Sequence, residues 1–205
     1  MTEMKERILN SSYELFMSYG VRSVSMDDIA KHLSISKKTI YQFYKDKNEL
    51  VHELMNKKLK QDEEDIKAII KGSANIIEEC FNIMKHLGKM MRQINPSFFY
   101  DLQKYHPKTW KLFKEFKENC IVKMVEDSLT RGTKQGLIRM DINIKILSRM
   151  RMEQIEMCFN PNVFPPNQFK IIDLQLSLQD HFLYGICTLK GHKLINKYKQ
   201  IIEED

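Results

Sequence analysis

Apolar side chains recur every three or four residues along most of this chain, and no segment alternates apolar and polar residues as a strand does. The pattern predicts an all-α protein, in which a three-helix N-terminal headpiece precedes a helical bundle, with about nine to ten helices in all. The first helix carries an apolar stripe from Ile8 to Tyr19. It is expected to stop at Gly20, because glycine readily adopts the left-handed conformation that ends helices.

Two short amphipathic segments follow, and each begins at a serine. Ser25 with Asp28 makes a capping-box pattern, in which the hydroxyl accepts a first-turn N–H and the carboxylate reaches back to the cap. After a tight turn Ser36 caps a second helix, where Ile40 and Tyr44 are four residues apart and point inward. This spacing predicts a helix-turn-helix over residues 25–44, although a plain structural bundle would show similar spacing.

The outward face of the second helix is polar and suits nucleic acid. Its side chains can donate to phosphate oxygens and base edges, and none of them suits covalent chemistry. These residues are Lys37, Lys38, Thr39, Tyr41 and Gln42. The alternatives are an ordinary solvated face for the lysines and a packing role for the tyrosine.

Residues 5–60 resemble the DNA-binding headpiece of the TetR/AcrR family of bacterial transcriptional regulators. Capping, core and contact positions all carry the resemblance: Ile8-Leu9, Leu15-Phe16, Gly20, Val24-Ser25, Asp28-Ile29-Ala30, Leu33-Ser34-Ile35-Ser36-Lys37-Lys38-Thr39-Ile40-Tyr41, Tyr44-Lys45, Lys47 and Glu49-Leu50. The resemblance implies a DNA-binding domain over residues 1–46. It also implies a helical ligand-sensing and dimerisation domain over 47–205, with a fourth helix from residue 47 linking the two.

The chain departs from the family pattern at three positions. Family members usually have glycine where this chain has Ser34, so this serine must accept a turn conformation that glycine adopts more easily. They often have glycine at Lys38 as well, where the lysine adds a positive charge beside DNA. Most carry His or Tyr in place of Phe43, which removes a polar atom that would reach phosphate.

The resemblance implies DNA-contacting roles across the headpiece. Lysine can donate to guanine and glutamine can pair with adenine, so Lys37, Lys38 and Gln42 are expected to read bases. The other contacts are expected to reach phosphate, which positions the protein without reading sequence. The full expected set is Ser25, Ser36, Lys37, Lys38, Thr39, Tyr41, Gln42, Phe43 and Lys47.

Charge supports a polyanionic partner. The formal net charge is +6 at pH 7, and the sequence pI is about 9.0. The excess is concentrated, because residues 31–47 hold five lysines against Asp46 as the single acidic residue. Basic charge gathered on a recognition helix is typical of proteins that bind double-stranded DNA.

Beyond the headpiece, the pattern predicts further helices that end at glycine or proline signals. Asp141 is expected to cap the helix over 141–159, and Gly191 is expected to close the helix over 168–190 before a short polar tail helix. The expected ranges are 47–70, 74–94, a short helix broken before Pro107, 108–134, 141–159 and 168–190.

The helix over 168–190 has two apolar faces. Ile171, Leu174, Leu178, Phe182, Gly185 and Leu189 make one seam, and Leu176, Leu183 and Cys187 make another. Such a helix is either fully buried in a monomer or shared with a partner. The family resemblance implies a homodimer through residues 143–159 and 168–190, with Gly185 permitting close helix approach. Two recognition helices about 34–36 Å apart would then read a pseudo-palindromic operator.

Aromatic and methionine side chains in the helical domain are candidates for an effector site. Such residues can line a cavity for a small apolar or aromatic effector, as they do in related regulators. The alternative is that they simply form part of the hydrophobic core. The candidate effector-binding residues are Phe81, Met84, Met91, Phe99, Tyr105, Trp110, Phe113 and Met124.

Several other classes of protein lack their sequence signals here. No HExxH, GxSxG, glycine-rich phosphate loop or clustered Cys/His set occurs, so we expect no enzyme, no metal and no cofactor. No apolar run approaches the ~20 residues that span a bilayer, and no signal-peptide core begins the chain, so we expect a cytoplasmic protein. The expected function is a ligand-responsive repressor. The alternatives are an activator of the same family and a non-specific nucleoid DNA-binding protein.

Overall fold

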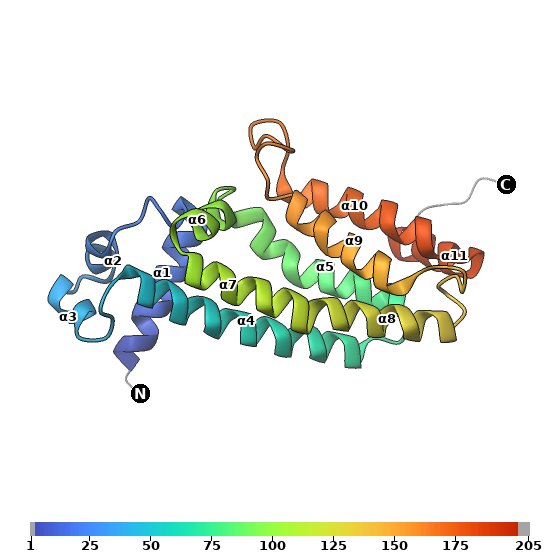
Figure 1. Cartoon of the computed structure of the whole chain (residues 1–205), viewed down its shortest axis with the longest axis horizontal. Coiled ribbons are helices and arrows are strands. Elements are labelled where there is room, and N and C mark those ends of the chain that lie inside the picture. Colours follow the sequence, from blue (N-terminus) through green and yellow to red (C-terminus); the bar gives the residue numbers. More distant parts are fainter. Residues whose placement is uncertain (1–2, 201–205) are drawn as a thin grey trace. The chain divides into compact units, whose positions relative to one another are not determined.

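The structure is a computed structural model that describes residues 3–200, except for the side chains at positions 89, 90 and 93. In this part of the chain there is no β-strand beyond an isolated bridge between Ile138 and Cys187, which confirms the all-α prediction. Figure 1 labels its helices. They are α1 (Glu3–Tyr19), α2 (Met26–Leu33), α3 (Lys37–Tyr41), α4 (Lys47–Gly72), α5 (Ile76–Gln93), α6 (Phe98–Tyr105), α7 (Pro107–Phe116), the π-helical turn η1 (Lys117–Ile121), α8 (Val122–Lys134), α9 (Ile144–Met157), α10 (Ile171–Ile186) and α11 (Leu189–Lys199).

These helices form two compact units. The first unit contains the described residues up to Gln61 together with Gln93–Phe116. The second unit contains Asp62–Arg92 and the described residues from Lys117 onward. The first unit is therefore larger than residues 1–46, because the start of α4 and the helices α6 and α7 belong to it. No helix among the described residues has the length and apolarity needed to cross a membrane.

The headpiece, helices α1 to α3, forms where local signals predicted it. Gly20 ends α1 with a φ of 84°, and its N–H donates to the Phe16 carbonyl at 2.9 Å. Both halves of the capping box between Ser25 and Asp28 are present, and Ser36 caps α3 by accepting the Thr39 N–H at 3.0 Å. The fully buried core side chains of these helices and the start of α4 are Ile8, Phe16, Ile29, Ile40, Tyr44 and Leu50.

In the turn between α2 and α3, Ser34 adopts the backbone conformation that glycine adopts more easily. The family's glycine would therefore be less strained at this position. Ser34 ends α2 in the left-handed region with φ 54° and ψ 40°. A left-handed L-residue costs about 1–2 kcal/mol, whereas glycine there loses about 0.5–1 kcal/mol of chain entropy. We expect Ser34→Gly to raise the free energy of unfolding by about 0.5–1 kcal/mol, measured as a rise in melting temperature. Ser34→Ala is the matched control, because alanine keeps the strain and should not stabilise.

Three helix boundaries in the second unit differ from the predictions. The helix expected over 108–134 is interrupted by η1, where the backbone inserts a π-helical turn. Asn143, not Asp141, caps α9, since the Asn143 side chain accepts the Ile146 N–H at 3.1 Å. Gly191 does not close a helix but lies inside α11, which Thr188 caps.

Helix α10 ends at Ile186 and does not continue to residue 190. Its buried residues are Ile171, Gln175, Gln179, Phe182, Leu183 and Ile186. The prediction of two apolar faces on this helix is therefore wrong. Two glutamines lie on its buried side, while Leu176 and Gly185, one from each expected seam, are exposed. Phe182, Leu183 and Ile186 of α10 pack in a core with residues of α5, α8 and α11 and of the segment after α8. The members from these parts include Ile77, Leu129, Ile195 and Ile138.

Candidate nucleic-acid interface

Helix α3 has one side packed against the protein and one side exposed, as a DNA recognition helix requires. Ile40 is fully buried and Tyr44, just beyond the helix, is almost fully buried, so they hold the segment against α1 and α2. The opposite side is exposed, and Figure 1 shows α3 at the periphery of the headpiece. The exposed predicted contacts are Ser36, Lys37, Lys38, Tyr41 and Gln42, while Thr39 and Phe43 are half-buried.

The N-terminal end of α3 is ordered by its own side chains. The Ser36 and Thr39 hydroxyl oxygens lie 2.8 Å apart, within hydrogen-bond distance. At the start of α2, the Ser25 hydroxyl donates to Asp28 at 2.6 Å, so this hydroxyl is already engaged in the cap. The hydrogen bonds from the Ser25 hydroxyl and N–H lower the pKa of Asp28, which keeps its carboxylate charged. The Ser36 cap orders the first turn of α3, which presents Lys37 and Lys38, and the Ser25 cap orders the first turn of α2.

Lys37 is restrained by an acidic neighbour on α2. Its ammonium donates to the Asp27 carboxylate at 2.8 Å and lies 6.0 Å from the centre of the Tyr41 ring. The hydrogen bond to Asp27 raises the pKa of Lys37, so the lysine stays charged at any physiological pH. Both partners are exposed, and an exposed ion pair of this kind is readily exchanged for a phosphate.

Removing the charge of Asp27 should therefore strengthen DNA binding. The Asp27→Asn change frees the Lys37 ammonium and removes a negative charge beside the DNA backbone, so we expect about threefold tighter binding at low salt and a smaller gain as salt rises. Fluorescence anisotropy with a labelled duplex measures this affinity at each salt concentration. Asp127→Asn makes the same charge change on α8 in the second unit and should leave affinity unchanged. Equal affinity of Asp27→Asn and the unaltered protein would contradict the contact.

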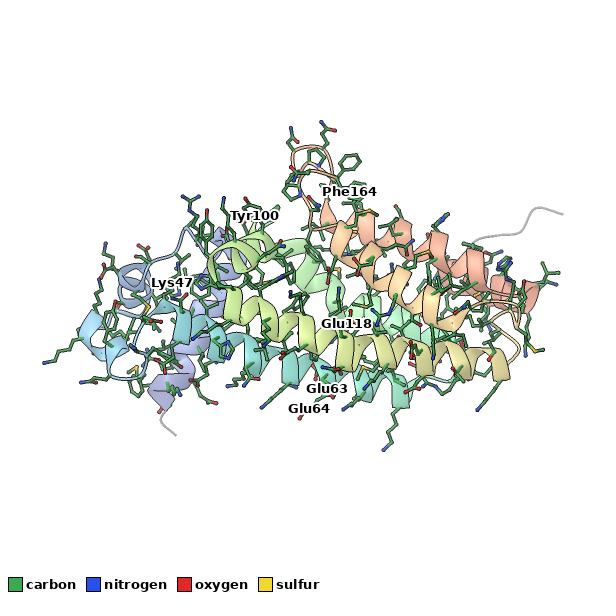
Figure 2. The ribbon with its side chains drawn as sticks, in the orientation of Figure 1. Lys47, Glu63, Glu64, Tyr100, Glu118 and Phe164 are labelled. Atoms are coloured by element: carbon green, nitrogen blue, oxygen red, sulfur yellow. The ribbon has the colours of Figure 1, made fainter. Side chains whose placement is uncertain are left out.

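Lys47, labelled in Figure 2, is held by the headpiece at the start of α4. Its ammonium donates to the Val21 carbonyl at 2.5 Å and lies 5.6 Å from the centre of the Phe16 ring. Burial lowers the pKa of Lys47 below its usual value, against the attraction of Asp101 and Asp28. In this conformation Lys47 ties α4 to the turn after α1, and its expected phosphate contact stays a prediction.

Helix α6 provides a second support for the headpiece that the sequence did not reveal. The buried Asp101 carboxylate accepts the Arg22 N–H at 2.8 Å, and the Arg22 guanidinium lies 5.1 Å from the centre of the Tyr105 ring. Just before α6, the Asn95 N–H donates to the Met17 carbonyl at 2.6 Å. The turn between α1 and α2 is thus fixed by residues more than seventy positions away, for which the sequence contains no local signal.

The structure divides the expected effector-binding residues between the two units. In the first unit Phe113 stacks on Trp110 with ring centroids 5.2 Å apart, and the tilted ring of Phe99 lies 5.3 Å from that of Phe113. Tyr105 of this unit packs under Arg22. In the second unit Phe81 stacks on Tyr198 at 5.5 Å. The remaining candidates in this unit, of which the first two are buried and the third half-buried, are Met84, Met91 and Met124. Their role in effector binding stays a prediction.

The capped headpiece and the exposed basic side of α3 define a helix-turn-helix DNA-binding protein. Comparison with known proteins gives the same result. Residues 8–54 match the family model described as bacterial regulatory proteins, tetR family. The N-terminal headpiece of this chain is thus that of the TetR family of transcriptional regulators.

Similarity extends beyond the headpiece. The HTH-type transcriptional regulator YvaF of Bacillus subtilis is 28% identical over 189 residues, covering 90% of this chain and 96% of that protein. A transcriptional regulator from Saccharomonospora viridis, solved in complex with choline, has a TM-score of 0.71 at 18% identity and covers 92% of this chain and 100% of its own. FadR from Bacillus subtilis in complex with stearoyl-CoA has a TM-score of 0.63 at 18% identity and covers 88% and 98%. These two structures share the fold.

Proposed function

We propose that this DNA-binding regulator is a ligand-responsive repressor that binds a pseudo-palindromic operator as a homodimer. The observation that carries the proposal is the orientation of α3. Ile40 is fully buried, while Lys37, Lys38 and Gln42 are exposed on the opposite side. In that orientation Lys38 and Gln42 are available for guanine and adenine edges in a major groove.

The dimer is supported by apolar side chains that α9 and α10 leave in solvent. Ile146 is 62% exposed and Met150 is 40% exposed on α9, one turn apart, and Leu176 is 44% exposed on α10. A Cβ built on Gly185 would meet no atom within 4 Å, so this position is open to a close neighbour. Two such helix pairs related by a two-fold axis would bury these side chains in a four-helix interface.

Response to an effector is supported by helices that join the headpiece to the rest of the chain. Helix α4 begins beside the headpiece at Lys47 and is continuous to Gly72 in the second unit. Structural neighbours were solved with choline and with stearoyl-CoA, so the fold accommodates small ligands. An effector that prefers one position of α4 would shift the population toward one separation of the two α3 helices.

Selection of bound sequences from a random duplex pool tests this function. We expect a two-fold symmetric sequence with half-sites about one helical turn apart, bound by two chains. At fixed salt its affinity should exceed that for random DNA by about 10³-fold or more, which a packaging protein would not show. Enrichment of no sequence would contradict specific regulation. Transcription in vitro from a promoter overlapping the selected site should fall when the protein is added, whereas an activator would raise it.

A further inference from the structure

The helix faces that α9 and α10 turn toward the interior of the second unit are unusually polar. Ser148 and Gln175 are fully buried, and Arg151 is only 8% exposed. Ser148 and Arg151 are one turn apart on α9. The Gln175 amide nitrogen donates to the Ile155 carbonyl at 3.0 Å, which places Gln175 beside the next turn of α9. These side chains put polar groups on helix faces where a bundle normally packs apolar residues.

Arg151 differs from the other buried or half-buried cations of this unit. Lys117 lies 2.8 Å from a Glu156 carboxylate oxygen and 3.2 Å from one of Glu153. Arg131 lies 2.7 Å from Glu79. Arg151 has no salt bridge among the described residues, and its Nη1 atom has no hydrogen-bond partner there. A buried guanidinium without a carboxylate is rare, because desolvation disfavours an uncompensated charge.

Among the described residues, no carboxylate is found to act on the Arg151 guanidinium. Its guanidinium lies 5.7 Å from the centre of the Phe182 ring, and Cys80 and Cys158 are the titratable groups that act on it. Burial raises the pKa of the Cys80 thiol to about 12 and that of Cys158 to about 11. Both thiols are therefore neutral, and burial lowers the pKa of Arg151 without a compensating anion.

Acceptors without partners accompany this cation. The Oε1 atom of Gln175 is buried and unpaired, although the Nε2 atom of the same amide is engaged with Ile155. The Oε1 atom of Gln154 and the Oγ atom of Ser148 also lack hydrogen-bond partners in the described part of the chain. A cation, two amide acceptors and a hydroxyl, bounded by an aromatic ring, match a carboxylic acid anion that carries its own donor group.

We propose that Arg151 binds the carboxylate of a small organic-acid effector, with Gln175 accepting a hydrogen bond from the effector and the Phe182 ring contacting its apolar part. The proposal rests on the ligand-responsive function proposed above and names the chemical class of its effector. It adds residues of α9 and α10 that the sequence did not indicate as ligand-binding.

Thermal unfolding of the full chain at constant ionic strength tests the site. The probes are lactate, 3-hydroxybutyrate and 4-hydroxybenzoate, which each carry a hydroxyl donor as well as the carboxylate. Each is compared with its neutral amide, and inorganic phosphate is tested beside them. We expect at least one carboxylate to raise the melting temperature. Its amide should not, because it lacks the negative charge that pairs with the guanidinium, and phosphate should not, because it has no apolar part to contact the Phe182 ring. The carboxylate should bind Arg151→Met at least about tenfold more weakly, by isothermal titration calorimetry.

Arg149→Met is the matched control. Arg149 is exposed and pairs with Glu118 at 2.9 Å. Its replacement removes the same charge from the same helix. This variant should keep carboxylate binding. Without ligand, Arg151→Met should melt at or above the temperature of the unaltered protein, since replacing an unpaired buried charge by an apolar side chain relieves desolvation. If Arg151→Met fails to fold, Gln175→Leu provides the second test of weakened binding.

The outcomes separate the site from the repressor function. The site is overturned if no carboxylate binds, if amide or phosphate binds equally, or if Arg151→Met binds like the control. Carboxylate binding that depends on Arg151 but leaves operator affinity unchanged would uphold the site and contradict ligand-responsive repression. Release of the operator by another compound, with no carboxylate binding, would uphold the repressor and overturn the site.

Discussion

Replacing Leu176 with glutamate is expected to convert the proposed homodimer into a monomer and to weaken operator binding by about 10²–10⁴-fold, the range by which linking two binding modules raises avidity. Leu176 is 44% exposed on α10, and α9 exposes Met150. A glutamate would carry an unpaired charge into the proposed four-helix interface, where its desolvation opposes association. Light scattering after size-exclusion chromatography measures the mass, and fluorescence anisotropy with the selected operator measures the affinity.

The matched control is Met140→Glu. Met140 is 87% exposed in the turn before α9, so the same charge is introduced in the same unit but outside the two interface helices. This variant should remain dimeric with full operator affinity. A Leu176→Glu protein that stays dimeric and binds the operator normally would show that the chains associate through another surface.

The headpiece could be predicted because its determinants are local. Ser25 and Asp28 are three residues apart, and Gly20 directly follows the helix that it ends, so short-range hydrogen bonds and backbone preferences decide these boundaries. The exposed side of α3 followed from the burial of Ile40 and Tyr44. The same locality explains why the sequence also indicated the cost at Ser34.

The second unit was less predictable because distant residues decide its local structure. Lys117 is buried in η1, where carboxylates of α9 compensate its charge, although a lysine within a helix usually indicates a solvated face. Gln175 and Gln179 occupy the buried side of α10 for a similar reason, since their amides donate to carbonyls of α9 and α5. A π-helical turn also rotates every later position, which a 3.6-residue period cannot represent.

The candidate DNA interface shows the same division. The exposure of Lys37 and Lys38 followed from helical spacing, whereas the ion pair between Lys37 and Asp27 depends on how α2 and α3 cross. The docking of Asp101 on the Arg22 N–H joins residues 79 positions apart. Periodicity reports which face of a helix is apolar, but it does not report which polar groups meet across the fold.

Replacing Gly20 with alanine tests how strongly α6 holds the headpiece. Gly20 has a φ of 84°, and a Cβ there would lie 2.6 Å from Ser97 Oγ and 3.1 Å from an Asp101 carboxylate oxygen. The left-handed backbone costs about 1–2 kcal/mol. Displacing Asp101 leaves the Arg22 N–H without its acceptor, which costs about 1–3 kcal/mol more. Together these costs are about 2–5 kcal/mol, so we expect the melting temperature to fall by roughly 4–20 °C, at about 2–4 °C per kcal/mol.

Gly136→Ala separates the two contributions. Gly136 has a φ of 68°, but a Cβ there would meet no atom within 4 Å, so this variant pays only the backbone cost. Its melting temperature should fall by roughly 2–8 °C. If the docking of α6 on Arg22 also positions α2 and α3, Gly20→Ala should weaken operator binding while Gly136→Ala should not. Equal melting temperatures of the two variants would show that Ser97 and Asp101 yield without cost and that α6 does not restrain the headpiece.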